Sequence, residues 1–218
     1  MPDAPRVWSL KNQSVGKVAE EAVKILRSGG VLVYPTDTIY GLGADPFQPA
    51  AVERVYRLKG RAFSKPIQVL IGERAMLDFL VEEIPPEAQK LTEVFWPGPL
   101  TLIFRAKKNL TGRFLGEGHT VGVRLPSHEF CRQLSLKLKG PVLSTSANVS
   151  GGGNPRSLGE IPREILTSVE AVVDGGTAQT ALPSTILNVV GGSVQLVREG
   201  ALPLEEIVQV VGDLKNTD

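Results

Sequence analysis

Short apolar runs alternate with amphipathic segments along this chain, and that alternation constrains its fold most. Residues 15–26 place their apolar side chains on one stripe at helical spacing. Val31, Leu32 and Val33 then form a short apolar run that ends at Pro35, which is typical of a buried strand. Because strands and helices are mixed without a regular βαβ alternation, we expect an α/β fold whose sheet has antiparallel parts.

The same patterns predict the remaining elements. Helices are expected at residues 49–60, 73–80, 86–96, 127–138 and 203–214. Strands are expected at residues 66–72, 100–106, 120–126, 140–148, 171–176, 184–190 and 193–199. The last two strands should form a hairpin. Ser14 and Ser127 are the expected N-caps of their helices, and Gly29 and Gly30 should end the first one.

Composition excludes several broad classes. The formal net charge of the 218 residues is +1, so no global electrostatic case exists for nucleic acid or membrane, although a local basic patch stays open. The single cysteine, Cys131, excludes an internal disulfide and suits a reducing compartment. No run approaches the roughly 20 apolar residues of a membrane span, and the N-terminus has no signal-peptide core. We therefore expect a cytoplasmic protein.

Common motifs for phosphate, metal and nucleophilic chemistry are absent. The pattern GxxxxGK[ST] does not occur, and the start of a GxGxxG at Gly41 fails because position 46 is proline. His119 and His128 do not pair with cysteines at zinc-ligand spacing. A Ser-His-Asp hydrolase lacks its GxSxG elbow.

Small polar residues gather where three strands begin or end. The stretches PTDT, STSAN and PST each adjoin an apolar run. Hydroxyls at strand ends can line the mouth of a pocket, as in many α/β proteins. Each stretch could equally serve turns and caps, and Asp37 and Asp45 suit such roles. We expect Gly41 and Gly43 to let the backbone turn sharply after the strand.

Four cationic side chains stand out by position. Lys59 and Arg61 flank Gly60 at a helix end, where they suit either a polyphosphate or simple solvation beside the helix dipole. Arg124 and Arg198 interrupt otherwise apolar strands. Such an arginine either faces solvent or lies in a pocket with an anionic partner.

Taken together, these stretches resemble one family. YPTDTIYGLGADPF, LKGR followed by KP, FWPGPLTLIF, TVGVRLP, STSAN, PSTILNV and VREGA stand in the order seen in the YrdC-type threonylcarbamoyl-AMP synthases. The resemblance runs from about Val15 to Leu204. It implies the short, single-domain bacterial form, with one domain over residues 1–218 and without the extra C-terminal domain of longer members.

The resemblance implies a twisted, mixed parallel and antiparallel open sheet with flanking helices around a large basic cavity. It implies a nucleotidyltransferase that converts L-threonine, bicarbonate and ATP into L-threonylcarbamoyl-AMP and pyrophosphate. Mg²⁺ would be carried mainly by ATP, without a protein ligand cluster. A separate transferase would then modify the tRNA adenosine next to the anticodon, and weak binding of tRNA or double-stranded RNA is also implied.

The resemblance also carries site residues over by motif. The expected threonine-binding residues are Thr36, Arg124, Ser144 and Ser184. The KxR and SxN patterns supply the expected catalytic residues Lys59, Arg61, Ser146 and Asn148. The expected ATP-binding residues are Lys59, Phe63, Thr120, Ser146, Asn154 and Arg198. One departure is the loop SGGGNPRS, which has glycine where the family often has proline.

Two other functions stay open beside the synthase activity. The first is an RNA-binding module without ATP turnover, which lacks support from an aromatic RNP pattern. The second is carbamoyl-phosphate chemistry, because a related domain occurs in a hydrogenase maturation protein whose zinc-finger region this chain lacks.

Overall fold

A computed structural model describes residues 4–214 of the chain. Its strands are β1 (Arg6–Ser9), β2 (Leu32–Tyr34), β3 (Gly41–Ala44), β4 (Val69–Leu70), β5 (Leu100–Arg105), β6 (Thr120–Arg124), β7 (Val142–Ser146), β8 (Ala171–Asp174), β9 (Thr185–Asn188) and β10 (Gln195–Arg198). Its helices are α1 (Val15–Arg27), α2 (Pro49–Lys59), α3 (Leu77–Leu80), α4 (Pro86–Phe95), α5 (Glu129–Leu138), α6 (Arg163–Leu166) and α7 (Leu204–Val211), with 3₁₀ turns η1 (Arg74–Met76) and η2 (Leu158–Glu160).

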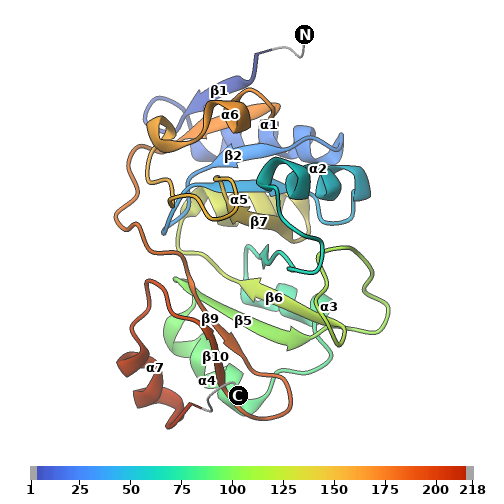
Figure 1. The fold of residues 1–218 in the computed structure, drawn as a ribbon, viewed down its shortest axis with the longest axis vertical. Coiled ribbons are helices and arrows are strands. Elements are labelled where there is room, and N and C mark those ends of the chain that lie inside the picture. Colours follow the sequence, from blue (N-terminus) through green and yellow to red (C-terminus); the bar gives the residue numbers. More distant parts are fainter. Residues whose placement is uncertain (1–3, 215–218) are drawn as a thin grey trace.

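The strands of the described residues form one sheet in the order β1-β8-β2-β3-β7-β4-β6-β5-β9-β10 (Figure 1). Four neighbouring pairs are parallel: β1 with β8, β2 with β8, β4 with β6, and β5 with β9. The other pairs are antiparallel, including the expected β9–β10 hairpin. The predicted mixed sheet with flanking helices is therefore confirmed.

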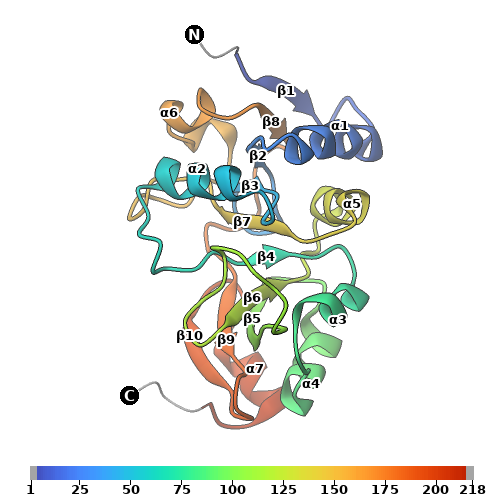
Figure 2. The same cartoon turned by 90° about the vertical axis from the view of Figure 1, so that its right-hand side faces the viewer.

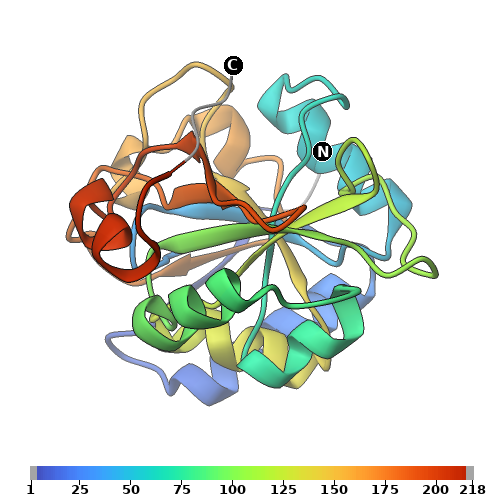
Figure 3. The same ribbon diagram turned by 90° about the horizontal axis from the view of Figure 1, so that it is seen from below.

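Helices cover both faces of this sheet (Figures 2 and 3). The helices α1, α5, α3 and α4 lie along one face, whereas α2 and α6 lie on the other. Strand β2 shows why both faces are apolar. Leu32 and Tyr34 pack in a cluster with α1 and α5, whereas Val33 packs in a second cluster with α2. Successive side chains of a strand point to opposite faces, so a strand covered on both sides reads as a continuous apolar run.

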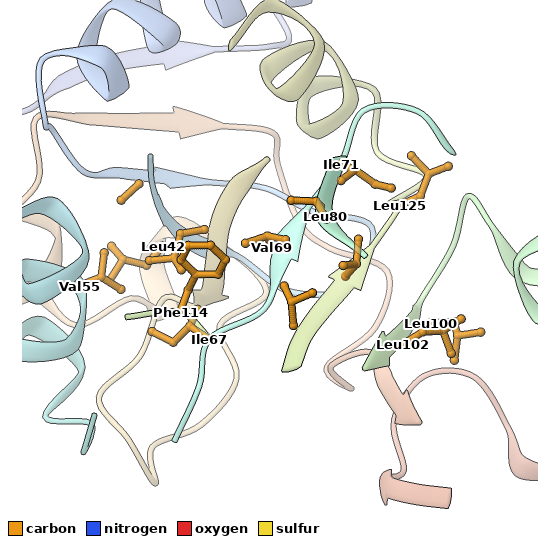
Figure 4. Packing of buried hydrophobic residues seen from close by; sticks show 14 of the residues in the cluster. Leu42, Val55, Ile67, Val69, Ile71, Leu80, Leu100, Leu102, Phe114 and Leu125 are labelled. Atoms are coloured by element: carbon orange, nitrogen blue, oxygen red, sulfur yellow. The ribbon is translucent and has the colours of Figure 1, made fainter. Parts of the chain in front are cut away.

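The larger cluster extends from α2 across the centre of the sheet to α4 (Figure 4). Val55 of α2 packs near Leu42 and Phe114, and Leu100 and Leu102 continue the cluster on β5. No helix among residues 4–214 is long and apolar enough to cross a bilayer.

The fold includes residues outside the stretch 15–204 over which the family resemblance runs. Strand β1 pairs in parallel with β8, and Ile207 of α7 is fully buried. Neither β1 nor the short helix α6 was expected from the sequence. β1 is an edge strand with exposed Arg6 and Val7, so it lacks the apolar run by which a buried strand is recognised.

Of the two expected N-caps, Ser127 is wrong and Ser14 is confirmed by its position alone. Helix α5 begins at Glu129, and its cap is His128, whose Nδ1 accepts a hydrogen bond from the backbone N–H of Phe130 at 3.2 Å. Ser127, the expected cap, instead donates to the carboxylate of Asp37. Ser14 stands at the N-cap position of α1 but makes no capping hydrogen bond through its side chain.

Gly41 and Gly43 do not form a turn, which corrects the sequence interpretation. Both lie inside β3, between β2 and β7, and are buried. A Cβ at Gly43 would lie 2.4 Å from Cε1 of Tyr34 on the neighbouring strand. Glycine is required here because the Tyr34 ring lies directly against the backbone of β3.

Candidate functional site

A polar pocket lies on one face of the sheet, and strand alternation creates it. On β6, Thr120, Gly122 and Arg124 line the pocket, whereas the intervening Val121 and Val123 belong to the apolar core. The same alternation places Thr101 of β5 in the pocket and Leu102 in the core. The pocket has a volume of about 180 Å³. This is below the range of about 300–1,000 Å³ for typical ligand sites, so the expected large cavity stays a prediction.

Most of the residues expected from the sequence meet in this pocket, although they come from distant parts of the chain. The lining includes Thr36, Arg61, Thr120, Arg124, Ser144, Ser146, Asn154, Ser184 and Arg198. Lys59, Asn148 and Phe63 do not belong to the lining.

The pocket is positively charged. Arg61, Arg124 and Arg198 line it, and no aspartate or glutamate does so. Burial lowers the pKa of Arg198, and the positive charges of Arg124 and Arg61 lower it further. Three guanidinium groups around a site without carboxylates favour an anionic ligand with several oxygen atoms.

Arg124 faces the pocket rather than solvent and is only 2% exposed. Its Nη2 donates to Oδ1 of Asp37 at 2.6 Å, its Nη1 donates to Thr38 Oγ1 at 3.0 Å, and its Nε donates to the Gly98 carbonyl at 3.0 Å. Asp37 also accepts from the backbone N–H of Ser127 at 3.2 Å. Asp37, considered above as a turn residue, is thus the ion-pair partner that fixes the guanidinium.

The KxR and SxN patterns come together through Lys59. Its buried ammonium lies 2.7 Å from the Ser146 carbonyl, 2.7 Å from the Asn148 carbonyl and 2.8 Å from Asn148 Oδ1. Burial lowers the pKa of Lys59 to about 8, and the charge of Arg61 adds to this effect. Lys59 and Asn148 therefore lie behind Ser146, beside the pocket.

Three expected nucleotide residues have other visible contacts. Phe63 is half exposed and packs on Tyr56, with the Arg113 guanidinium 4.9 Å from its ring centroid. Asn154 donates to the Ala181 carbonyl at 3.1 Å, which joins two loops at the pocket. Thr120 donates to the Glu117 carbonyl at 3.0 Å.

The structure adds pocket residues that the sequence interpretation missed. Gln68 and Thr101 line the pocket, and Thr101 Oγ1 donates to Gln68 Oε1 at 2.8 Å. Tyr34, which is fully buried, donates its hydroxyl to Ser144 Oγ at 2.8 Å. Gln68 could have been found by the criterion applied to Arg124, because it is a polar residue inside an apolar strand segment.

A mixed α/β sheet with a cationic, carboxylate-free pocket on one face defines a class of protein suited to binding small anionic ligands. A family model for Sua5, YciO and YrdC proteins, described as "Telomere recombination", matches residues 24–200. The chain belongs to this family.

Relatives in several organisms are similar over most of this chain. The threonylcarbamoyl-AMP synthase of Pyrococcus abyssi is 36% identical over 89% of this chain and 57% of its own length. A putative threonylcarbamoyl-AMP synthase of Methanocaldococcus jannaschii is 30% identical over 94% of this chain and 96% of its own length. This chain thus spans little more than half the length of the Pyrococcus relative.

Solved structures agree with the fold. P. abyssi Sua5 complexed with L-threonine matches 99% of this chain and 63% of its own, with a TM-score of 0.91 and 32% identity. E. coli YciO matches 93% of this chain and 99% of its own, with a TM-score of 0.81 and 26% identity. Full-length HypF shares the fold alone, at 16% identity and a TM-score of 0.72.

Proposed function

We propose that this protein is a threonylcarbamoyl-AMP synthase, which converts L-threonine, bicarbonate and ATP into L-threonylcarbamoyl-AMP and pyrophosphate. The observation that carries the proposal is the meeting of the threonine-side and nucleotide-side residues in one cationic pocket. Relatives named threonylcarbamoyl-AMP synthase support it. The same proposal includes a single domain over residues 1–218 and a cytoplasmic location.

The threonine end of the pocket contains Thr36, Arg124, Ser144 and Ser184. Tyr34 donates its hydroxyl hydrogen to Ser144, so the hydrogen of Ser144 is free for a carboxylate oxygen. Arg124 is held by Asp37 and Thr38 but has further N–H groups on Nη1 and Nη2 for the same carboxylate. The complex of P. abyssi Sua5 with L-threonine supports this choice of ligand.

The ATP end contains Arg61, Thr120, Ser146, Asn154 and Arg198. We assign the phosphates to the two arginines and Ser146, because these groups offer charge-assisted hydrogen bonds to phosphoryl oxygens. Lys59 and Asn148 would act through Ser146, since both contact it and neither lines the pocket. Backbone contact from Phe63 to ATP is kept as an expectation.

The reaction needs no covalent enzyme intermediate. The threonine amine loses a proton to solvent and attacks the carbon of bicarbonate, which gives an N-carboxy group and releases one water. An oxygen of that carbamate then attacks the α-phosphorus of ATP, and pyrophosphate leaves with the electron pair of the broken P–O bond. The pocket would contribute by holding these groups together and by placing positive charge near the phosphates.

A divalent metal fits this pocket only as part of the nucleotide. The described residues contain no cluster of three His, Cys, Asp or Glu side chains that could hold a metal, and the pocket lining has no carboxylate. The side chains of the pocket therefore suit an ATP molecule that carries Mg²⁺ on its own phosphate oxygens. When bound, the metal would neutralise charge on the phosphates. A downstream transferase and weak RNA binding complete the proposed set of partners.

Mass spectrometry of products after incubation with ATP, L-threonine and bicarbonate tests the proposal. We expect a threonylcarbamoyl-AMP ion and pyrophosphate only when all three substrates are present. Ser146→Ala should lose most of this synthesis while keeping a wild-type fold. Robust ATP cleavage without threonine would contradict the proposal, and tight salt-dependent RNA binding without turnover would favour the RNA-binding rival.

A further inference from the structure

Gln68 lines the pocket and is linked by hydrogen bonds, directly or through Thr101 and Ser184, to residues assigned to both of its ends. It directly precedes β4, and β4 lies between β7 and β6 in the sheet. Its backbone carbonyl accepts from the Ser144 N–H at 2.9 Å, which fixes the residue beside the threonine end. We propose that the side-chain amide of Gln68 binds bicarbonate, and then the carboxylate of the carbamate formed from it. This inference rests on the proposed function.

A chain of hydrogen bonds determines which end of the Gln68 amide is free. Arg198 Nη2 donates to Ser184 Oγ at 3.3 Å, and Ser184 Oγ lies 2.8 Å from Thr101 Oγ1. The only hydroxyl hydrogen of Thr101 goes to Gln68 Oε1 at 2.8 Å, so Ser184 must be the donor to Thr101. The oxygen of the Gln68 amide is therefore occupied within the protein.

The nitrogen of that amide is left for a ligand. Among the described residues, Nε2 of Gln68 has no hydrogen-bond partner, and no buried side-chain nitrogen or oxygen is without one. Nε2 is thus accessible from the pocket that Gln68 lines. Gly122, which also lines the pocket, has no side chain to fill the space beside Gln68.

A neutral amide suits the proposed oxygen atoms chemically. Threonine would lie toward Arg124 and Ser144, and the phosphates toward Arg198, so the bicarbonate carbon must lie between them to react with the amine. A carbamate oxygen must also stay nucleophilic toward phosphorus. An amide N–H orients such an oxygen without adding the full positive charge of an arginine, which would withdraw its electron density.

The test compares Gln68→Met with Gln68→Glu by measuring pyrophosphate release against bicarbonate concentration, at saturating ATP and threonine. Gln68→Met removes the donor, and the KM for bicarbonate should rise about tenfold, as for a hydrogen bond to a charged group. Gln68→Glu keeps the acceptor for Thr101 but places a negative charge beside the anion. Its KM for bicarbonate should therefore rise further than that of Gln68→Met.

Which of the two variants has the higher KM for bicarbonate shows whether Gln68 binds the anion or only supports the structure. If Gln68 served only to hold Thr101, Gln68→Glu would be the milder change. Circular dichroism should show a wild-type fold in both variants, and calorimetric titration should give near wild-type threonine affinity in the uncharged variant Gln68→Met. Thr101→Val, which frees the Gln68 amide to rotate, should raise the KM for bicarbonate less than Gln68→Met does.

Gln89→Met and Gln89→Glu on the exposed surface of α4 are the matched controls, and both should behave as the wild type. A wild-type KM for bicarbonate in both Gln68 variants, or a milder effect of Gln68→Glu than of Gln68→Met, would overturn this inference alone. A wild-type chain that releases no pyrophosphate with bicarbonate would overturn the proposed function, and this inference with it.

Discussion

At the scale of single residues, the pocket depends on buried charges whose partners lie far apart in sequence. Arg124 and Asp37 are 87 positions apart and form an ion pair of which the arginine side chain is 3% exposed and the aspartate side chain 12% exposed. Removing one member leaves the other charge buried and unpaired, which is strongly destabilising. Functional effects at Arg124 must therefore be separated from effects on stability.

The first prediction concerns ligand selectivity at Arg124. Arg124→Lys keeps the positive charge but loses the planar fork, so threonine affinity should fall by more than ATP affinity. Arg124→Ala should weaken threonine binding further, by about 2–5 kcal/mol. Calorimetric titration of each ligand into each folded variant checks this. Arg198→Ala is the matched control and should weaken ATP binding more than threonine binding. Unchanged threonine affinity in Arg124→Ala would refute the assignment of Arg124 to the threonine carboxylate.

The second prediction follows from the lowered pKa of Lys59. Its ammonium is buried and has no carboxylate partner among residues 4–214, and its pKa falls from the usual 10.5 to about 8. Between these pH values the unfolded chain keeps a proton that the folded chain has released. The unfolded state then binds more protons, so folding stability due to Lys59 must rise with pH.

Urea unfolding at several pH values measures this effect against Lys59→Met. The free energy of unfolding of the wild type should increase relative to Lys59→Met as the pH rises from about 8 to 10.5. The comparison removes contributions from other titrating groups, because both chains share them. A difference that stays constant or falls over this range would contradict the lowered pKa.

At the scale of elements, close approach between strands controls the site. Gly43 of β3 lies under the ring of Tyr34 on β2, and Tyr34 in turn holds Ser144 on β7. The backbone of one strand thus positions a pocket hydroxyl on another. A side chain at Gly43 would move the Tyr34 ring and, with it, the hydrogen bond to Ser144.

The third prediction is that Gly43→Ala destabilises the fold by about 1–3 kcal/mol, the typical cost of overpacking a buried site. A Cβ at this position would lie 2.4 Å from Tyr34 Cε1. Urea denaturation measures the change. Gly153→Ala is the control, since a Cβ there would meet nothing within 4 Å. Equal stability of the two variants would contradict the packing argument.

At the scale of the whole molecule, both ends of the described chain contribute to the fold. Strand β1 forms one edge of the sheet, and α7 closes the core near α4, where Ile207 is fully buried. The pocket is lined by residues of the central strands, of β9–β10 and of nearby loops, and by none of α4 or α7. Stability and ligand binding should therefore be separable at α7.

The fourth prediction is that Ile207→Ala lowers the free energy of unfolding by about 2–5 kcal/mol while threonine affinity stays unchanged. The neighbouring Val208 is 39% exposed, so Val208→Ala should have a much smaller effect. Urea denaturation and calorimetric titration on the same samples provide both quantities. A loss of threonine affinity in folded Ile207→Ala would contradict this separation.

The sequence by itself determined the fold class, most helices and strands, and the set of polar residues at strand ends. Apolar periodicity reports local burial, so it predicted β2, α2 and the β9–β10 hairpin. It also marked Arg124 and Arg198 as unusual, because charged residues rarely interrupt apolar strands. It did not predict β1 or α6, whose few residues carry no clear period.

Only the tertiary structure decided how those residues meet. Strand order brought Asp37 to Arg124, packed Lys59 behind Ser146, and pressed Gly43 against Tyr34. It also joined Gln68 to Arg198 through Thr101 and Ser184. Local patterns cannot specify such contacts, because they depend on which strands become neighbours. That choice is made by packing the whole core, in which residues far apart in sequence compete for the same positions.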